Sequence, residues 1–122
     1  MNVEAVREYC LSLPLATEDM PFGEGTLVFR VSGKIFALID LDDSSWFCLK
    51  CEPDYAVELR ETYREIKPAW HMNKKYWNQV DLFASLDDTL IASLIRHSYR
   101  QVVAKLPRKW RAAHPETDIA EP

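Results

Sequence analysis

The chain has 122 residues, of which 48% are hydrophobic and 28% charged, and such a composition is typical of one globular domain. It excludes a disordered chain, a coiled coil and a collagen-like repeat. The longest apolar run, Ile35–Ile39, is far shorter than the roughly 20 residues of a membrane helix, and a formal net charge of −4 argues against a protein whose whole surface binds nucleic acid.

The first elements that we expect are a helix and a loop. Val3, Val6, Cys10 and Leu13 repeat at helical spacing between an Asn2 cap and Pro14. The charged residues in this segment stand where a signal peptide would have its apolar core, so we expect a cytoplasmic protein. Two prolines and two glycines between residues 14 and 25 predict a loop.

Three strands should follow as an antiparallel meander. Thr26–Val31 alternates apolar and polar side chains, and Ser32-Gly33 favours a tight hairpin turn. Lys34–Leu41 is apolar on both faces, which indicates a central strand. A turn over residues 42–45 then leads into a strand at Trp46–Cys51.

In the second half of the chain we expect two helices and at least one strand. Pro53 suits the first turn of a helix that continues over Asp54–Arg64. Residues 66–79 show no clean period, although Tyr76–Phe83 resembles a strand whose buried members are Trp77, Val80 and Leu82.

The last helix has the strongest pattern. Ser85 can cap it, Asp87 and Asp88 suit its first turn, and its apolar residues continue to Leu106 with Arg96 and Arg100 nearly opposite. We expect residues 108–122 to form a basic, mobile tail.

This order of elements, α-β-β-β-α-(β)-β-α, predicts an α+β fold. It would be a two-layer sandwich in which helices cover a mainly antiparallel sheet, the meander plus one or two further strands. We expect residues 1–107 to form its single domain.

Charge is distributed unevenly along the chain. Residues 1–59 carry a net charge of −7 and residues 60–122 a net charge of +3, and six bases but no acid lie within Arg96–His114. An anionic partner could therefore bind a basic face made by the second half. A solvated helix face with a basic tail explains the same pattern.

Basic and aromatic residues close together suit single-stranded nucleic acid, because its phosphates contact the basic side chains and its nucleobases stack on the aromatic rings. We assign candidate nucleic-acid contacts to Lys74, Lys75, Tyr76, Arg96, Arg100, Lys109 and Arg111. Structural roles are expected for His71 in an irregular loop, for Asn73 as the cap of a short turn, and for Trp77 as a buried strand residue. If the Lys74/Lys75 pair and the Arg96/Arg100 pair lay on different faces, no single groove would exist, and the protein-interaction module would gain support.

The cysteines indicate neither metal nor redox chemistry. Cys48 and Cys51 form a C-x-x-C pair, but they lie on an expected strand, where positions three apart point to opposite faces. Neither His71 nor His97 has the spacing of a second zinc ligand pair. Because no nucleophile has an adjacent base, we expect no catalytic residue, no cofactor and no enzymatic activity.

A longer pattern resembles the bacterial MmcQ/YjbR family of small proteins and extends over about residues 3–111. Its pieces are Phe22-Gly23, Val28-Phe29-Arg30-Val31-x-Gly33-Lys34-Ile35-Phe36-Ala37, Leu49-Lys50-Cys51, Leu59-Arg60, Tyr63, Lys67-Pro68-Ala69-Trp70-His71-Met72-Asn73-Lys74, Trp77, Asp81-Leu82 and Ser98-Tyr99-x-x-Val102-Val103-x-x-Leu106-Pro107. The chain departs from that pattern at Phe83-Ala84, where the family has a glycine.

The resemblance implies a two-layer α/β fold and a function that is unassigned. Many members carry the label of DNA-binding protein, which rests largely on fold analogy. We therefore expect DNA as a partner, bound without sequence preference. The alternative is a module that binds another protein or a small ligand, with no membrane association in either case; the sequence leaves the oligomeric state open.

Overall fold

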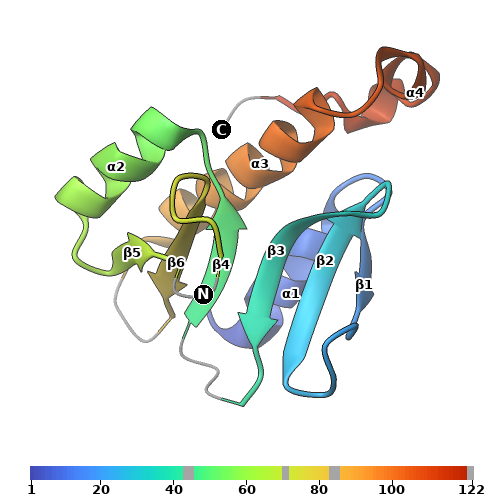
Figure 1. The fold of residues 1–122 in the computed structure, drawn as a ribbon. Helices are drawn as coiled ribbons and strands as arrows, with labels where there is room; N and C mark the ends of the chain where they lie inside the picture. The colour runs from blue at the N-terminus through green and yellow to red at the C-terminus, as the bar shows by residue number, and fades with distance from the viewer. Residues whose placement is uncertain (43–45, 70–71, 83–85, 121–122) are drawn as a thin grey trace.

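The computed structural model describes residues 1–42, 46–69, 72–82 and 86–120, and Figure 1 shows how its helices and strands are arranged. Along the chain the elements are α1 (Val3–Ser12), β1 (Thr17–Asp19), β2 (Thr26–Val31), β3 (Lys34–Asp40), β4 (Trp46–Lys50), α2 (Pro53–Thr62), β5 (Ile66–Pro68), β6 (Trp77–Asp81), α3 (Asp88–Ala104), α4 (Arg108–Ala113) and the 3₁₀ turn η1 (Pro115–Thr117).

All six strands form one antiparallel sheet in the order β1-β2-β3-β4-β6-β5. The expected meander is confirmed, and β3 is an interior strand, as its apolar composition indicated. The meander turn expected after Asp42 lies largely outside the described residues.

β1 lies where a loop was expected, so the prediction for residues 14–25 was wrong there. The strand pairs Thr17–Asp19 with Val28–Arg30 at the edge of the sheet. Two ion pairs hold it, one between Glu18 and Arg7 of α1 and one between Asp19 and Arg30 of β2. Three residues are too few to show a period of two, which explains why the sequence pattern missed it.

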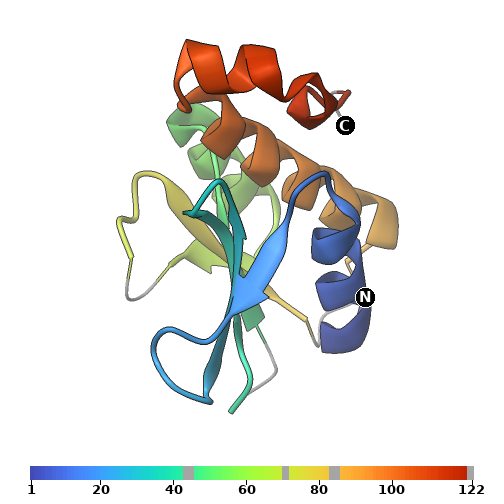
Figure 2. The same ribbon diagram turned by 90° about the vertical axis from the view of Figure 1, so that its right-hand side faces the viewer.

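Helices α1, α2 and α3 cover one face of the sheet, which Figures 1 and 2 show from two directions. Each contributes buried side chains to the main core, among them Val6, Leu59 and Ile95. A smaller cluster of Val28, Leu38, Cys48 and Ala69 occupies the opposite face, which none of these helices covers. The α+β class with helices on a mainly antiparallel sheet is thereby confirmed.

The caps of the helices agree in part with the sequence. The Asn2 side chain accepts the Ala5 N–H at 2.8 Å, as expected. α3 is capped by Asp87, which accepts the Thr89 N–H; the expected cap, Ser85, lies outside the described residues. Asp87 was therefore a cap and not a first-turn residue, because its backbone is still extended.

The faces of β6 correct a second expectation. Val80 is buried in the main core, but Trp77 is partly buried in the smaller cluster on the other face. Residues three apart on a strand cannot share a face. The main-core face takes Asn78 instead, whose Oδ1 accepts a hydrogen bond from Arg60 and whose amide donates to the Ala56 carbonyl.

The segment after Pro107 is folded and differs from the mobile tail that we expected. α4 and η1 turn back along α3, and Thr117 is 2% exposed. Arg96 donates to the carbonyl of Ala120 at 2.9 Å, and Arg100 donates to that of Ile119. These arginines attach the chain end to α3. No helix in the described part of the chain is long and apolar enough to span a membrane.

Candidate nucleic-acid interface

A basic cleft of about 550 Å³ lies at the end of the sheet where β2 ends, β3 begins and the last turn of α3 passes. Its lining residues are Arg30, Gly33, Lys34, Ile35, Lys50, Trp77, Val102, Lys105 and Leu106. Among these described residues four are bases and none is an acid. The cleft therefore presents an unbalanced positive charge.

Local structure brings its basic residues together. The Ser32-Gly33 turn has φ of 49° and 76°, the left-handed conformation of a tight hairpin, and it places Lys34 at the strand end. Lys50 closes β4 directly opposite Trp77 of β6. Lys105 is the C-cap of α3, where the negative end of the helix dipole favours a cation.

The charges of the cleft act on Lys50. Burial lowers the pKa of this amine, and the like charges of Lys105 and Lys34 lower it further. Arg30 contributes less net charge, because it is paired with Asp19 at 2.9 Å and donates to the Gly33 carbonyl. The electrostatic centre of the cleft is thus formed by three lysines, and a bound anion would relieve their repulsion.

Aromatic rings border these lysines. The ammonium groups of Lys75 and Lys105 lie 5.5 and 5.2 Å from the ring centroid of Tyr76, within the range of cation–π contacts. Trp77, the next residue, lines the cleft itself and is only partly buried. A phosphate and a base of one nucleotide could therefore be contacted side by side.

The loop before β6 places several of the predicted residues. Lys75 and Tyr76 adjoin the cleft through Lys105. The Asn73 side chain accepts the Lys75 N–H at 3.0 Å, so the expected turn cap is confirmed. Lys74 is exposed, and its carbonyl accepts a hydrogen bond from Arg60. His71 and Trp70 lie outside the described residues.

The other predicted nucleic-acid contacts lie outside the basic cleft. Arg96 and Arg100 bond the C-terminal segment, Lys109 is exposed on α4, and Arg111 donates to the Leu106 carbonyl at 3.1 Å. No described cleft contains both the lysine pair and the Arg96/Arg100 pair.

Sequence reasoning did not find the bases that line the cleft. Only Arg30 and Lys34 are close in the chain, while Lys50 and Lys105 are distant from them and from each other, so no local run of bases marks the set. The signal that was available is positional: Arg30 and Lys34 flank one tight turn, and Lys50 ends a strand of the same meander.

The thiols show no reactive arrangement. Cys51 belongs to the main core and Cys48 to the cluster on the opposite face, as the strand spacing predicted. Burial raises the pKa of Cys10, Cys48 and Cys51 to about 12. No group of three or more potential metal ligands occurs among the described residues. The His97 Nε2 accepts the Glu52 N–H at 3.1 Å, which ties α3 to the start of α2.

The fold and the cleft define a small α+β protein whose helices cover one face of an antiparallel sheet. The sequence model of the YjbR family matches residues 11–101, and the chain belongs to this family. The resemblance seen in the sequence is thereby confirmed.

The matching relatives are uncharacterised proteins of similar length. The chain is 30% identical to uncharacterized protein YjbR of Escherichia coli K12, covering 91% of this chain and 95% of the relative. It is 34% identical to uncharacterized protein YbdF of E. coli O157:H7, covering 87% and 88%. A crystal structure of the Deinococcus radiodurans protein DR2400, described as a DUF419 domain, matches with a TM-score of 0.86 and 34% identity over 92% of this chain and 86% of that one.

Proposed function

We propose that this protein binds single-stranded DNA without sequence preference along the basic cleft. The observation that carries the proposal is the convergence of Lys34, Lys50 and Lys105 on one hollow that has no acid among its described lining residues. Such a hollow attracts phosphate through charge alone and does not read bases.

The neighbouring rings favour a single strand over a duplex. Trp77 lines the cleft and Tyr76 adjoins it, and a stacked base contributes roughly 1–3 kcal/mol whatever its identity. In a duplex the base faces are covered by their neighbours and cannot stack on protein rings. The proposal includes the expected cytoplasmic location, with which three free, buried cysteines are in keeping.

The test is a titration of a fluorescently labelled oligothymidylate with the full chain, followed by anisotropy at several salt concentrations. Three phosphate contacts predict a slope of log K against log salt of about −2, since each contributes about −0.7 on a single strand. A matching duplex should bind more weakly. Absence of saturable binding even at low salt would refute the proposal.

Two double variants distinguish binding in the basic cleft from attraction by the overall charge of the protein. Lys50→Gln with Lys105→Gln removes two charges from the cleft, and we expect at least a tenfold loss of affinity and a flatter salt slope. Lys67→Gln with Lys109→Gln removes the same charge from two exposed positions, on β5 and α4, that do not line the cleft. An equal loss of affinity in both double variants would contradict the proposed site.

A different observation favours the alternative module. The open face of the sheet has a mainly apolar hollow of about 280 Å³ lined by Phe22, Thr26, Leu38, Asp40, Trp46, Cys48 and Met72. Phe22 is 69% exposed at its edge. Exposed apolar surface around a hollow is typical of a ligand or protein contact. If the oligothymidylate failed to bind while an apolar ligand shifted the amide resonances of Thr26 and Leu38, this second function would replace the first.

A further inference from the structure

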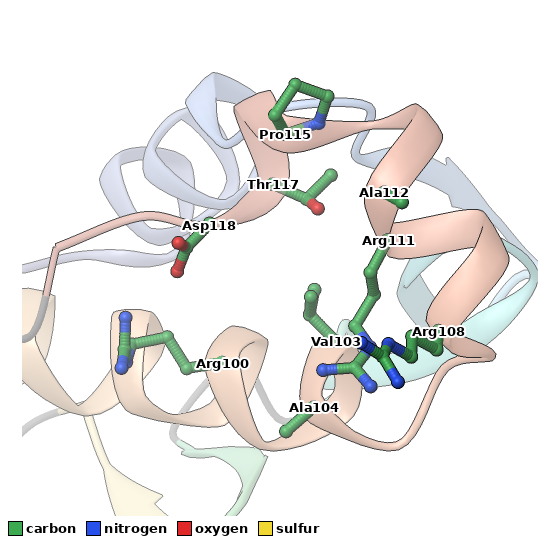
Figure 3. A pocket seen from close by; sticks show the side chains of 9 residues that line it. All are labelled: Arg100, Val103, Ala104, Arg108, Arg111, Ala112, Pro115, Thr117 and Asp118. Carbon is green, nitrogen blue, oxygen red and sulfur yellow. The ribbon is translucent and has the colours of Figure 1, made fainter.

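A pocket of about 450 Å³, separate from the basic cleft and from the apolar hollow, lies between α3 and the folded C-terminal segment. Its lining residues are Arg100, Val103, Ala104, Arg108, Arg111, Ala112, Pro115, Thr117 and Asp118. Figure 3 shows their side chains around this space. The pocket is lined by Val103 and Ala104 of α3, whereas the basic cleft is lined by Val102 and Lys105. The pocket and the cleft therefore lie on different sides of the same end of α3.

Three guanidinium groups and one carboxylate set the charge of this pocket. Arg108 and Arg111 are three residues apart on α4 and therefore share a face, and both line the pocket. Asp118 and Arg100 line the other side of the same space. The lining thus has a formal excess of two positive charges, concentrated at the α4 side.

The hydrogen bonds of these arginines leave donors for a ligand on that side. The bond from Arg111 to the Leu106 carbonyl uses Nε, so the two terminal nitrogens of that group can still donate. Arg100 is engaged with the carbonyl of Ile119. The Thr117 hydroxyl donates to the His114 carbonyl at 2.8 Å and thereby fixes the wall that carries Asp118.

We propose that this pocket binds a small phosphate monoester. Two adjacent guanidinium groups match a phosphate, which has close to two negative charges and three acceptor oxygens, better than a carboxylate, which one guanidinium satisfies. Val103, Ala112 and Pro115 offer apolar surface to the organic part of such a molecule. Asp118 opposes anion binding and limits the affinity. The proposal is independent of the single-strand cleft.

The test is an NMR titration of the ¹⁵N-labelled full chain with inorganic phosphate and with ribose 5-phosphate; ribose is the control. We expect saturable shifts of the amide resonances of Ala112, Thr117 and Asp118 with both phosphates, and tighter binding of ribose 5-phosphate. If only inorganic phosphate bound, the ester part of the proposal would be wrong. Absence of saturable shifts up to millimolar phosphate would refute the whole proposal.

Four variants sharpen the result. Arg108→Gln should weaken ribose 5-phosphate binding at least tenfold, and Arg111→Lys, which keeps the charge but loses the paired donors, at least threefold. Asp118→Asn should tighten binding several-fold, because it removes the opposing carboxylate. Lys109→Gln is the matched control on the same helix, exposed and outside the pocket, and should change affinity less than twofold.

Two outcomes would overturn the site. If Lys109→Gln weakened binding as much as Arg108→Gln did, the attraction would be a general charge effect. If the double variant at Lys50 and Lys105 abolished the shifts, the phosphate would occupy the basic cleft instead. We expect that double variant to lose oligothymidylate binding and to keep phosphate binding. This result would show that the two ligands occupy different sites.

Discussion

Lys50 combines an unfavourable position for folding with a favourable one for binding. Its amine is partly removed from water and faces the like charges of Lys105 and Lys34, and both effects lower its pKa. The charged form of Lys50 is therefore less stable in the folded protein than in the unfolded chain. Residues that a binding site requires are often placed at such a cost to stability.

We predict that Lys50→Gln stabilises the protein while it weakens DNA binding. Removing the like-charge repulsion should raise the free energy of unfolding by about 0.5 kcal/mol at pH 7. Because the folded pKa of Lys50 is lower than its unfolded one, the unfolded chain binds more protons at this site between the two values, and the Lys50 contribution to stability should rise with pH across that window. The raised pKa values of the three thiols act in the opposite direction in wild type and variant alike. Urea denaturation of both proteins at pH 7 and pH 10 therefore measures the difference between them: the stabilisation by Lys50→Gln should be smaller at pH 10 than at pH 7. A variant less stable than wild type at pH 7 would contradict this account.

The thiols give a second prediction at this scale. The thiolate is the reactive form, and pKa values of about 12 leave almost none of it at pH 8. All three cysteines are also buried. The native protein should therefore react with a disulfide reagent such as Ellman's only at the rate of its unfolding, and urea should release three thiols at once. Rapid modification of one native thiol would show an accessible site.

Single residues differ in how far the sequence predicts them. That Cys48 and Cys51 point apart follows from strand geometry alone. The approach of Lys105 to Lys50 and Tyr76 cannot be predicted in this way, because α3 and the sheet meet only through tertiary packing. The role of Arg96 and Arg100 was missed for a similar reason: their partners are backbone carbonyls of the chain end, which no side-chain pattern marks.

At the scale of elements, α3 is joined to the sheet by one buried hydroxyl. Ser98 is fully buried, donates to the Phe36 carbonyl at 2.5 Å and accepts the Lys50 N–H at 2.8 Å. It thus joins α3 to β3 and β4 next to the basic cleft. Nearby, Tyr99 donates from its hydroxyl to the Pro14 carbonyl and its ring packs edge-on against Phe36. The Ser98-Tyr99 pair of the family pattern therefore has a structural role.

We predict that Ser98→Ala lowers the free energy of unfolding by about 2 kcal/mol, because it leaves a buried carbonyl and a partly buried N–H unsatisfied. Ser93→Ala is the control: its hydroxyl donates only to the Leu90 carbonyl one turn earlier on the same helix, and the change should stay within about 0.5 kcal/mol. Chemical denaturation of both variants measures the difference. Equal losses would mean that Ser98 does not join the two layers.

The elements predicted best are those with a long apolar period. α1, β2, β3, β4, α2 and α3 follow from that period to within a few residues. β1 is too short to show one, and the C-terminal segment has too few apolar residues to predict its return along α3. The cleft requires the relative placement of β2, β3, β4, β6 and α3, so its existence could not be read from any one of them.

At the scale of the whole molecule, the sheet has two unlike faces. One lies under three helices and belongs to the main core, while the other carries the small cluster around Val28 and is bordered by the apolar hollow at Phe22. A cavity made under the helices is closed on all sides. A cavity made on the uncovered face can be relieved by movement of its neighbours or by entry of water.

β2 offers a matched pair that tests this difference, since Val28 and Val31 are both 0% exposed and lie on opposite faces. We predict that Val31→Ala costs about 2–3 kcal/mol, the transfer of two methyl groups plus an unrelieved cavity, whereas Val28→Ala costs about 1–1.5 kcal/mol. Urea denaturation with an unchanged m-value makes the two comparable. Equal costs would show that the second face is as tightly closed as the first, and they would remove the physical basis for placing an apolar ligand there.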